Sequence, residues 1–287
     1  MSLRKRLLQW KYAFRSTVAR EPLLAPLHRL IVWWTQAKMR GHIDTRECRV
    51  GPETDIVLDG FQGTANSFAT RAFKMAQDRP VCIAHHLHAP AQILKAARRG
   101  IPTIVTIRNP IDAAASLLSR WPYIAPDQAL RSYARFYEKL EPYKDQVVVS
   151  PFSQTTGHLD RVFEALNRRF GTDFAVFAHT EDQTRALRDP AALQSREEQQ
   201  RRSRKTQAKQ TLGSDASRAL RRRARSIHQH LQAFGIGQLA RIQPSPAGSN
   251  RKARFIGSAP IDEPHAQARR HVSIRRSAPS RAEIAPA

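Results

Sequence analysis

The feature that most constrains the fold is a strand, a loop of small residues and a helix that follow one another between Val57 and Phe73. The stretch reads VLDGFQGTANSFATRAF: an apolar run ends at Gly60, and apolar or small residues recur at helical spacing from Phe68. In such an arrangement successive backbone N–H groups and the positive end of the helix dipole point into one concavity. The stretch therefore predicts a site for a phosphate group or a similar anion.

Strands alternate with helices along the following hundred residues, which predicts an α/β fold with a parallel sheet. Continuous apolar runs such as PTIVTI at 102–107 are typical of buried parallel strands. The expected strands are 55–60, 81–84, 102–107 and 146–150, and the expected helices are 91–99, one opened by Pro110, 126–140 and 154–170. We expect residues 51–180 to form one α/β domain with the sheet in its centre.

The loops that follow these strands should share one edge of the sheet, because the carboxyl ends of parallel strands lie together and ligands bind there. They begin at Gly60, His85, Arg108 and Pro151. Candidate functional residues are therefore expected in these loops.

The flanking regions have a different character. Residues 1–50 predict an N-terminal helical segment with a break near Glu21 and Pro22, and 181–240 predict a basic helical extension rich in Arg, Lys and Gln. Residues 241–287 are rich in Pro, Ser, Ala and Arg and are expected to be a disordered tail. The net charge of +24 predicts polyanionic partners. Only Cys48 and Cys82 are present, which favours a reducing compartment, so we expect a cytoplasmic protein.

The first 34 residues are basic and amphipathic, and their apolar stretches are too short for a signal peptide or a membrane span. Two interpretations stay open for this segment. It is a helix packed on the domain surface, or it attaches to an anionic membrane face with Trp10, Trp33 and Trp34 at the interface.

A second motif, IRNPIDAAASLLSR, follows the expected strand at 102–107. Its Arg108 should emerge at the sheet edge, and Ser116 lies in the helix that Pro110 opens. The two side chains could hold one phosphate, since arginine offers a fork of donors and serine a further one. The alternative is that Arg108 pairs with Asp112 at the helix start and Ser116 has no special role.

The two motifs together resemble those of the sulfotransferase family, which uses 3′-phosphoadenosine 5′-phosphosulfate (PAPS). GFQGTANS at 60–67 is similar to the family's 5′-phosphosulfate loop, and RNPIDAAAS at 108–116 matches its 3′-phosphate motif. The resemblance spans about residues 53–175. It implies a three-layer, P-loop-like domain that transfers a sulfuryl group from PAPS to a hydroxyl or amine acceptor.

The resemblance also implies roles for individual residues. Arg108 and Ser116 would hold the 3′-phosphate. The 5′-phosphosulfate would lie on the loop, held by backbone and hydroxyl groups at Gly60, Thr64, Asn66 and Ser67.

The family's catalytic histidine precedes the 3′-phosphate motif by about twenty residues, which places His88 closest in the segment HHLHAP, with His85 and His86 as rivals. His88 would accept the acceptor's proton, a role that suits histidine near neutral pH. We expect no metal site here, because no Asp or Glu lies near these histidines in the sequence.

One departure from the family pattern separates two hypotheses. Gly63 stands where the family has a lysine or arginine that neutralises charge on the leaving group, and a missing electrostatic contact of this kind lowers rates about a hundredfold or more. The alternative function is therefore a degenerate relative that binds an adenine nucleotide or polyanion without turnover. The loop also lacks the GK[ST] ending of nucleotide triphosphatases, which disfavours kinase chemistry.

Basic residues that could fold over the nucleotide are Arg201, Arg204 and Lys205.

Overall fold

The structure is a computed structural model that describes residues 2–38, 49–178, 180, 185, 187, 196–214 and 217–241. Four strands form one sheet in the order β2–β1–β3–β4, and each neighbouring pair is parallel. The strands are β1 Ile56–Gly60, β2 Ile83–His85, β3 Thr103–Ile107 and β4 Val148–Pro151. The sequence-based expectation of an α/β fold with a central parallel sheet is confirmed.

Helices precede, connect and follow the strands. They are α1 Leu3–Arg20, α2 Ala25–Lys38, α3 Asn66–Ala76, α4 Pro90–Arg98, α5 Pro110–Arg120, α6 Pro126–Leu140, α7 Phe152–Gly157, α8 Leu159–Phe170, α11 Arg196–Gly213 and α12 Arg218–Ala240, with short 3-10 turns η1 Pro22–Leu24 and η2 Glu141–Gln146. Three of these helices, α4, α5 and α6, begin with proline, whose fixed φ suits a first helical position. The side chain of Asn109 also caps α5 by accepting a hydrogen bond from the backbone N–H of Ile111.

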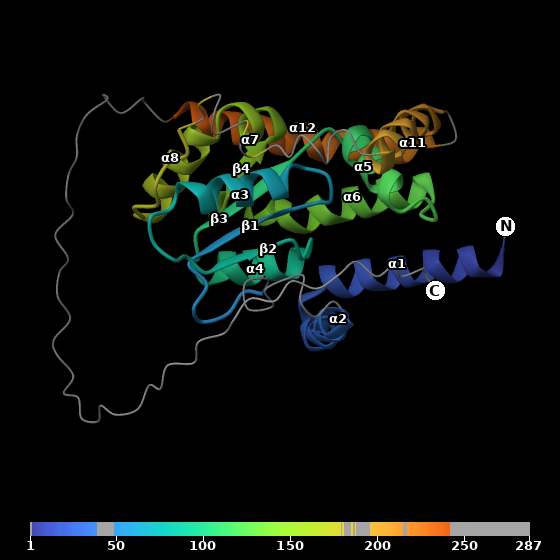
Figure 1. The fold of residues 1–287 in the computed structure, drawn as a ribbon, viewed down its shortest axis with the longest axis horizontal. Coiled ribbons are helices and arrows are strands. Elements are labelled where there is room, and N and C mark those ends of the chain that lie inside the picture. The colour runs from blue at the N-terminus through green and yellow to red at the C-terminus, as the bar shows by residue number, and fades with distance from the viewer. Residues whose placement is uncertain are drawn as a thin grey trace, which may run out of the picture. The chain divides into compact units, whose positions relative to one another are not determined.

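The two faces of the sheet bury alternate residues of each strand, as the pleat requires. On one face, Ile56, Leu58 and Ile104 pack against apolar side chains of α3 and α8 such as Phe73 and Phe163. On the other face, strand residues that include Val105, Ile107 and Val149 pack against apolar side chains of α4, α5 and α6. Helices thus cover both faces of the sheet (Figure 1).

Helix α12 closes the sheet at β4. The side-chain oxygen of Gln238 accepts a hydrogen bond from the Val149 N–H at 2.9 Å, and its amide group donates to the Val147 carbonyl at 2.8 Å. A Cβ on Gly235 would lie 2.6 Å from the Val149 carbonyl oxygen, so only glycine permits this approach. The glutamine side chain therefore bonds to the edge of β4 as a neighbouring strand would, and α12 is part of the packed domain.

Helix α7 packs with α3 and α8, whereas α1 and α11 lie on the side of α4, α5 and α6. Helix α11 packs along α5, whereas α1 contacts α2, α4 and α6 (Figure 1). The described residues from Ser2 to Arg241 belong to one compact unit. Among these residues no helix is long and apolar enough to cross a membrane.

The predicted element order is observed, with two local differences. Strand β2 begins at Ile83, two residues later than expected, because Asp55 engages the backbone of Cys82 with both its side chain and its N–H. The single helix expected at 154–170 is two helices that are broken at His158, where φ is –145°. The expected N-terminal helices with a break after Arg20 are observed. The predicted tail lies outside the described residues beyond Arg241.

Candidate functional site

The strand order creates a switch point between β1 and β3. The chain leaves β1 toward β2 on one side, crosses back to β3, and continues outward to β4. Gly60 pairs with Thr106, so the loops after the two central strands begin side by side. Ligands of open parallel sheets bind at such a point, beyond the carboxyl ends of the strands.

The loop after β1 has the backbone form of an anion cradle. Gly63 has a φ of 81° and Ala65 a φ of 75°, both in the left-handed region, and α3 begins directly after them at Asn66. Within the described part of the chain, the backbone N–H groups of residues 65–67 have no hydrogen-bond partner. These N–H groups lie at the positive end of the α3 dipole, where an anion is stabilised.

Two loop side chains that the resemblance assigns to the phosphosulfate serve the loop itself. The buried Thr64 hydroxyl donates to the Phe61 carbonyl at 2.6 Å and lies 2.8 Å from the hydroxyl of Thr106. The buried Asn66 amide donates to the carbonyls of Gly60 and Phe61, both at 3.2 Å. In this structure the Thr64 hydroxyl and the Asn66 amide are thus engaged inside the loop, and their expected role as ligands stays a prediction.

Gly60 also has an internal role. A Cβ at this position would collide with the backbone and side chain of Thr106, so glycine permits the close pairing of β1 and β3 at their ends. The adjacent Phe61 N–H donates to the Tyr137 hydroxyl at 3.2 Å, and that hydroxyl donates to the Thr106 carbonyl at 2.7 Å. Full burial raises the pKa of Tyr137 well above its usual range, so the hydroxyl stays protonated and can donate.

Arg108 emerges at the sheet edge as expected and points to the loop. Its Nη1 donates to the Gly63 carbonyl at 3.0 Å, and its guanidinium lies 3.9 Å from the ring centroid of Phe152. The Tyr133 hydroxyl fixes the backbone by donating to the Arg108 carbonyl at 2.5 Å. Burial lowers the pKa of Arg108, and Asp112 opposes this shift, but the ordinary value is high enough to leave the side chain charged.

Ser116 meets the same glycine from α5. A Cβ built on Gly63 would lie 2.7 Å from both the Cβ and the Oγ of Ser116, so the two residues are in direct contact. The two residues of the RNPIDAAAS motif that the resemblance singles out, Arg108 and Ser116, therefore converge on one point of the loop. Their convergence required tertiary structure, since they are eight residues apart and some fifty residues from the loop.

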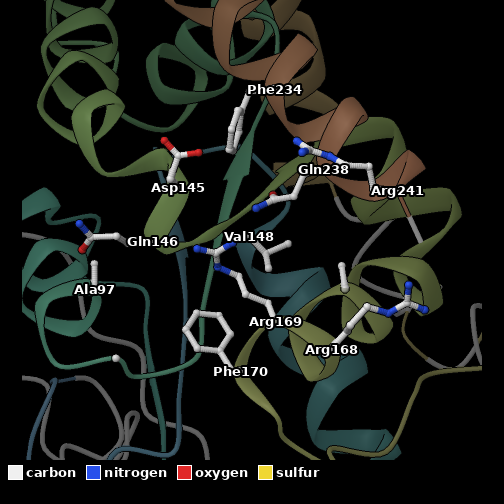
Figure 2. A pocket seen from close by; sticks show the side chains of 12 residues that line it. Ala97, Asp145, Gln146, Val148, Arg168, Arg169, Phe170, Phe234, Gln238 and Arg241 are labelled. Carbon is white, nitrogen blue, oxygen red and sulfur yellow. The ribbon is translucent and has the colours of Figure 1, made fainter. Parts of the chain in front are cut away.

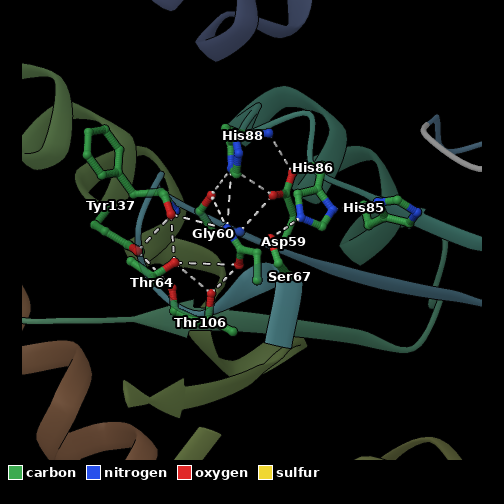
Figure 3. A network of polar contacts seen from close by, with 11 residues as sticks. Asp59, Gly60, Thr64, Ser67, His85, His86, His88, Thr106 and Tyr137 are labelled. Atoms are coloured by element: carbon green, nitrogen blue, oxygen red, sulfur yellow. Dashed lines mark hydrogen bonds and ion pairs between the residues drawn. The ribbon is translucent and has the colours of Figure 1, made fainter. Parts of the chain in front are cut away.

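His88 is held by Asp59, which directly precedes Gly60 in β1. The buried Asp59 carboxylate accepts the His88 N–H at 2.8 Å and the Gly60 N–H at 2.9 Å, and it lies 3.3 Å from the ring Nδ1 of His88 (Figure 3). That Nδ1 is also 2.8 Å from the Gly60 carbonyl. The Asn66 amide nitrogen, a donor, also lies 3.3 Å from Nδ1, but the shorter contact is to a carbonyl, which only accepts. It favours a proton on Nδ1 and a lone pair on Nε2. His88 thus has the tautomer that a general base needs.

The other two histidines form a separate pair beside His88. His86 Nε2 lies 2.8 Å from the exposed Ser67 hydroxyl, and its Nδ1 lies 2.6 Å from His85 Nδ1 (Figure 3). Burial, reinforced by the neighbouring His85 and His88, lowers the pKa of His86 from 6.5 to about 4. His86 is therefore neutral at pH 7. Of the loop residues expected to bind the phosphosulfate, Ser67 has an exposed side chain.

Helix α11 adds cations to this edge. Its residues Arg201, Lys205, Ala208 and Leu212 are spaced as one helical face, and all four are at least partly buried. Lys205 lies within electrostatic range of Arg108, Lys209 and Asp112, and its pKa is lowered first by burial and then by the two like charges. Lys209 forms an ion pair with Asp112. Asp112 thus pairs with Lys209 rather than with Arg108, and positive charge remains in excess beside the loop.

The three basic residues proposed from sequence have different positions. Lys205 is near Arg108, and Arg201 is near Arg120 at the far end of α5. Arg204 donates to the Ser119 carbonyl at 3.4 Å and to the side chain of Gln200 at 3.3 Å. Of these three residues, only Lys205 has its charge within electrostatic range of Arg108 in the contacts described.

A hollow of about 680 Å³ lies at the opposite edge of the sheet (Figure 2). Gly100 and Gln146, which precede β3 and β4, form part of its wall together with arginines 168, 169 and 241. The loop amides, the histidines and Arg108 are not among its lining residues. The candidate site is therefore at the carboxyl edge of the sheet, where the loop amides, the histidines and Arg108 lie.

Sequence reasoning did not assign a role to several residues that build the site, namely Asp59, Thr106, Tyr133, Tyr137 and Phe152. Phe152 follows an expected strand at the predicted edge, so its position was a usable signal. The tyrosines lie in α6, where helical periodicity marks them only as core residues. In the described part of the chain no group of three His, Cys, Asp or Glu side chains is arranged to hold a metal ion.

Comparisons with protein-family models, with curated proteins and with solved structures each find no match for this chain. The assignment of a function therefore rests on the geometry of the site and on the two sequence motifs.

Proposed function

We propose that this protein is a sulfotransferase-like enzyme with a P-loop-like fold, which transfers a sulfuryl group from PAPS to a hydroxyl or amine acceptor. The observation that carries the proposal is the meeting of Arg108 and Ser116 at Gly63. It joins the two motifs that resemble the family's nucleotide-binding elements at one edge of the sheet. A general small-residue turn would not require a charged side chain and a hydroxyl from another strand and helix to meet it.

In this proposal the nucleotide is held by groups of two kinds. The 5′-phosphosulfate lies against the backbone N–H groups of residues 65–67 and the Ser67 hydroxyl, and the 3′-phosphate lies against Arg108 and Ser116. The guanidinium keeps its position through Phe152 and the Gly63 carbonyl, so little side-chain entropy is lost when an anion binds.

His88 is the proposed general base. Its Nε2 takes the proton of the acceptor hydroxyl or amine, the acceptor atom bonds to sulfur, and the bond between sulfur and the bridging oxygen breaks. The electron pair of that bond leaves with 3′-phosphoadenosine 5′-phosphate. Asp59 stabilises the imidazolium formed in the step, because its carboxylate lies 3.3 Å from Nδ1.

Lys205 is the proposed substitute for the cation that Gly63 does not provide. It comes from α11 rather than from the loop, and it is partly buried near Arg108 with like charges around it. An anion bound on the loop would offset that repulsion. It would favour the protonated form of Lys205, and protonated Lys205 would in turn favour anion binding. In this arrangement charge on the leaving phosphate is neutralised from the side of α11.

Nucleotide binding is tested by thermal unfolding of the full chain with 3′-phosphoadenosine 5′-phosphate. We expect a rise in Tm that grows with nucleotide concentration, since a ligand that binds only the folded state stabilises it. Arg108→Ala should abolish the rise. Arg79→Ala, which removes an exposed arginine paired with Asp173 beyond the other end of α3, should keep it. No rise for the wild-type chain at millimolar nucleotide would overturn the proposal.

The second candidate function is a nucleotide or polyanion binder without turnover, and the glycine at residue 63 favours it. Transfer of labelled sulfate from PAPS to a panel of hydroxyl and amine acceptors separates the two. If Lys205 acts as proposed, Lys205→Ala lowers transfer by about a hundredfold, whereas Arg202→Ala on the exposed face of the same helix leaves it unchanged. A Tm rise without any transfer would favour the binding function.

A further inference from the structure

Helix α1 has two opposite faces that differ in their partners. One face docks on the domain: Gln9 donates to the Tyr123 carbonyl at 2.9 Å, and Gln128 donates to the Gln9 carbonyl at 2.7 Å. The other face carries four large apolar side chains at helical spacing that are 41% to 84% exposed: Leu3, Leu7, Trp10 and Phe14. The rings of Trp10 and Phe14 stack with centroids 5.5 Å apart. An apolar stripe on the solvent side of a docked helix has no role in the fold.

The turn η1 and the helix α2, which contact α1, also carry exposed apolar side chains. The further large apolar side chains that are exposed are Leu23, Leu27, Leu30, Trp33 and Trp34. In the rest of the described chain, large apolar side chains are exposed only at Met75, Val176 and Ile236. Such concentration in one segment marks an interaction surface, because single exposed apolar residues are normally scattered.

Basic residues lie among these apolar ones. Residues 2–34 contain Arg4, Lys5, Arg6, Lys11, Arg15, Arg20 and Arg29. Glu21 is the acidic residue of this range, and it is bound to Arg20 at 2.8 Å and to Lys139 at 2.9 Å. The surface therefore has a net positive charge and no carboxylate left to balance it.

A basic hollow borders the stripe. It has a volume of about 400 Å³, lies between α1 and α6, and has Trp10 in its wall. Its charged lining consists of one acidic residue, Asp127, and three basic ones, Arg20, Arg131 and Arg135. An anionic head group would be stabilised at this point while the aromatic ring beside it lies at a membrane interface.

We propose that the surface formed by α1, η1 and α2 binds the face of an anionic lipid bilayer. A helix lies in a bilayer interface when apolar and aromatic side chains enter the acyl boundary and lysine and arginine contact the head groups. A second copy of this chain is the poorer occupant, since it would bring two surfaces of the same positive charge together. The inference is independent of the proposed sulfuryl transfer, because none of these residues belongs to the candidate site.

The test is sedimentation of the full chain with vesicles of phosphatidylcholine alone or with 30% phosphatidylglycerol. The high net charge demands matched variants, because other basic regions also attract anionic vesicles. Leu3→Gln/Leu7→Gln/Trp10→Gln should weaken binding to the anionic vesicles at least tenfold, also in 0.5 M salt, where the apolar contribution dominates. Arg4→Gln/Lys5→Gln/Arg6→Gln should weaken binding at least tenfold at low salt.

A third variant, Arg202→Gln/Arg222→Gln/Arg225→Gln, removes the same number of charges from exposed positions on α11 and α12 and should change binding less than threefold. All variants change exposed side chains, and equal Tm values would show that they fold. The proposal is overturned if the apolar variant binds as well as the wild type. It is also overturned if light scattering reveals a dimer that the apolar variant dissociates, since a second copy would then cover the surface.

Discussion

Gly63 and Ser116 are in direct contact, with the Cβ and Oγ of Ser116 both 2.7 Å from the place where a Cβ on Gly63 would lie. The contact leaves no room for a side chain at residue 63 in this arrangement of the loop and α5. A longer side chain at residue 63 would displace α5, and its φ of 81° is itself unfavourable for any residue with a Cβ. In the proposed function a cation for the leaving group would therefore come from another element, and α11 lies along α5.

Gly63→Ala should destabilise the protein through both effects. The left-handed backbone costs an alanine about 1 to 2 kcal/mol, and the collision with Ser116 adds about 1 kcal/mol or more. We expect the free energy of unfolding from urea titration to fall by the sum, and the Tm rise with nucleotide to disappear.

Gly100→Ala is the matched control, because Gly100 has a φ of 68° but no atom within 4 Å of an added Cβ. It should show the backbone cost alone and keep the response to nucleotide. Equal losses of stability in the two variants would mean that the contact with Ser116 relaxes at no cost.

His88→Asn should remove sulfuryl transfer and spare nucleotide binding. Asparagine tolerates the φ of 48° at this position and can still donate to the Gly60 carbonyl, but it has no basic nitrogen. Loss of a general base lowers kcat by about a hundredfold to ten-thousandfold. The measurement is labelled-sulfate transfer together with the Tm rise caused by the nucleotide.

His86→Asn is the comparison for this prediction, since His86 also has a positive φ, of 58°. Its neutral ring contacts Ser67, so its loss should change nucleotide affinity more than kcat. If His86→Asn abolished transfer and His88→Asn did not, the roles of the two histidines would have to be exchanged.

Because of His86, the free energy of unfolding should decrease as the pH is lowered below about 6.5. Its pKa is lowered to about 4 in the folded state, so between these two values the unfolded chain binds more protons and acid favours unfolding. Above 6.5 the histidine is neutral in both states and has no effect. The full difference corresponds to a free energy on the order of 3 kcal/mol.

The pH effect is measured by urea unfolding between pH 4 and 8 for the wild type and His86→Asn. Burial also lowers the pKa values of His28 and His228, but both are present in both proteins, so the difference isolates His86. Parallel stability curves would show that His86 titrates normally in the folded chain.

Gln238→Ala should weaken the edge of the sheet. Both hydrogen bonds to β4 are lost, which leaves the Val149 N–H and the Val147 carbonyl to find new partners and costs about 1 to 3 kcal/mol. Gln229→Ala on the same helix is exposed and should change stability by less than about 0.5 kcal/mol. Faster hydrogen exchange at Val149 in the first variant would identify the lost bond, and unchanged exchange would contradict its importance.

The local features of this chain were readable from its sequence. The apolar run at Thr103–Ile107 and the helix begun by Pro110 are where they were expected, because burial pattern and proline chemistry act over a few residues. The loop from Gly60 to Ser67 was recognisable for the same reason. The break at His158 was missed, since one residue with an extended backbone interrupts a pattern that is otherwise continuous.

The order of strands and helices, the small-residue loop after β1 and the uneven distribution of charge could be read from the sequence. The three-dimensional packing was needed to find that Thr64 and Asn66 bond within the loop, that Asp59 orients His88, that Gln238 bonds to the edge of the sheet and that Lys205 lies near Arg108. These relationships depend on which residues distant in sequence pack together. Spacing along the chain reports helices and strands, whereas partners across the chain are chosen by the packing of whole elements.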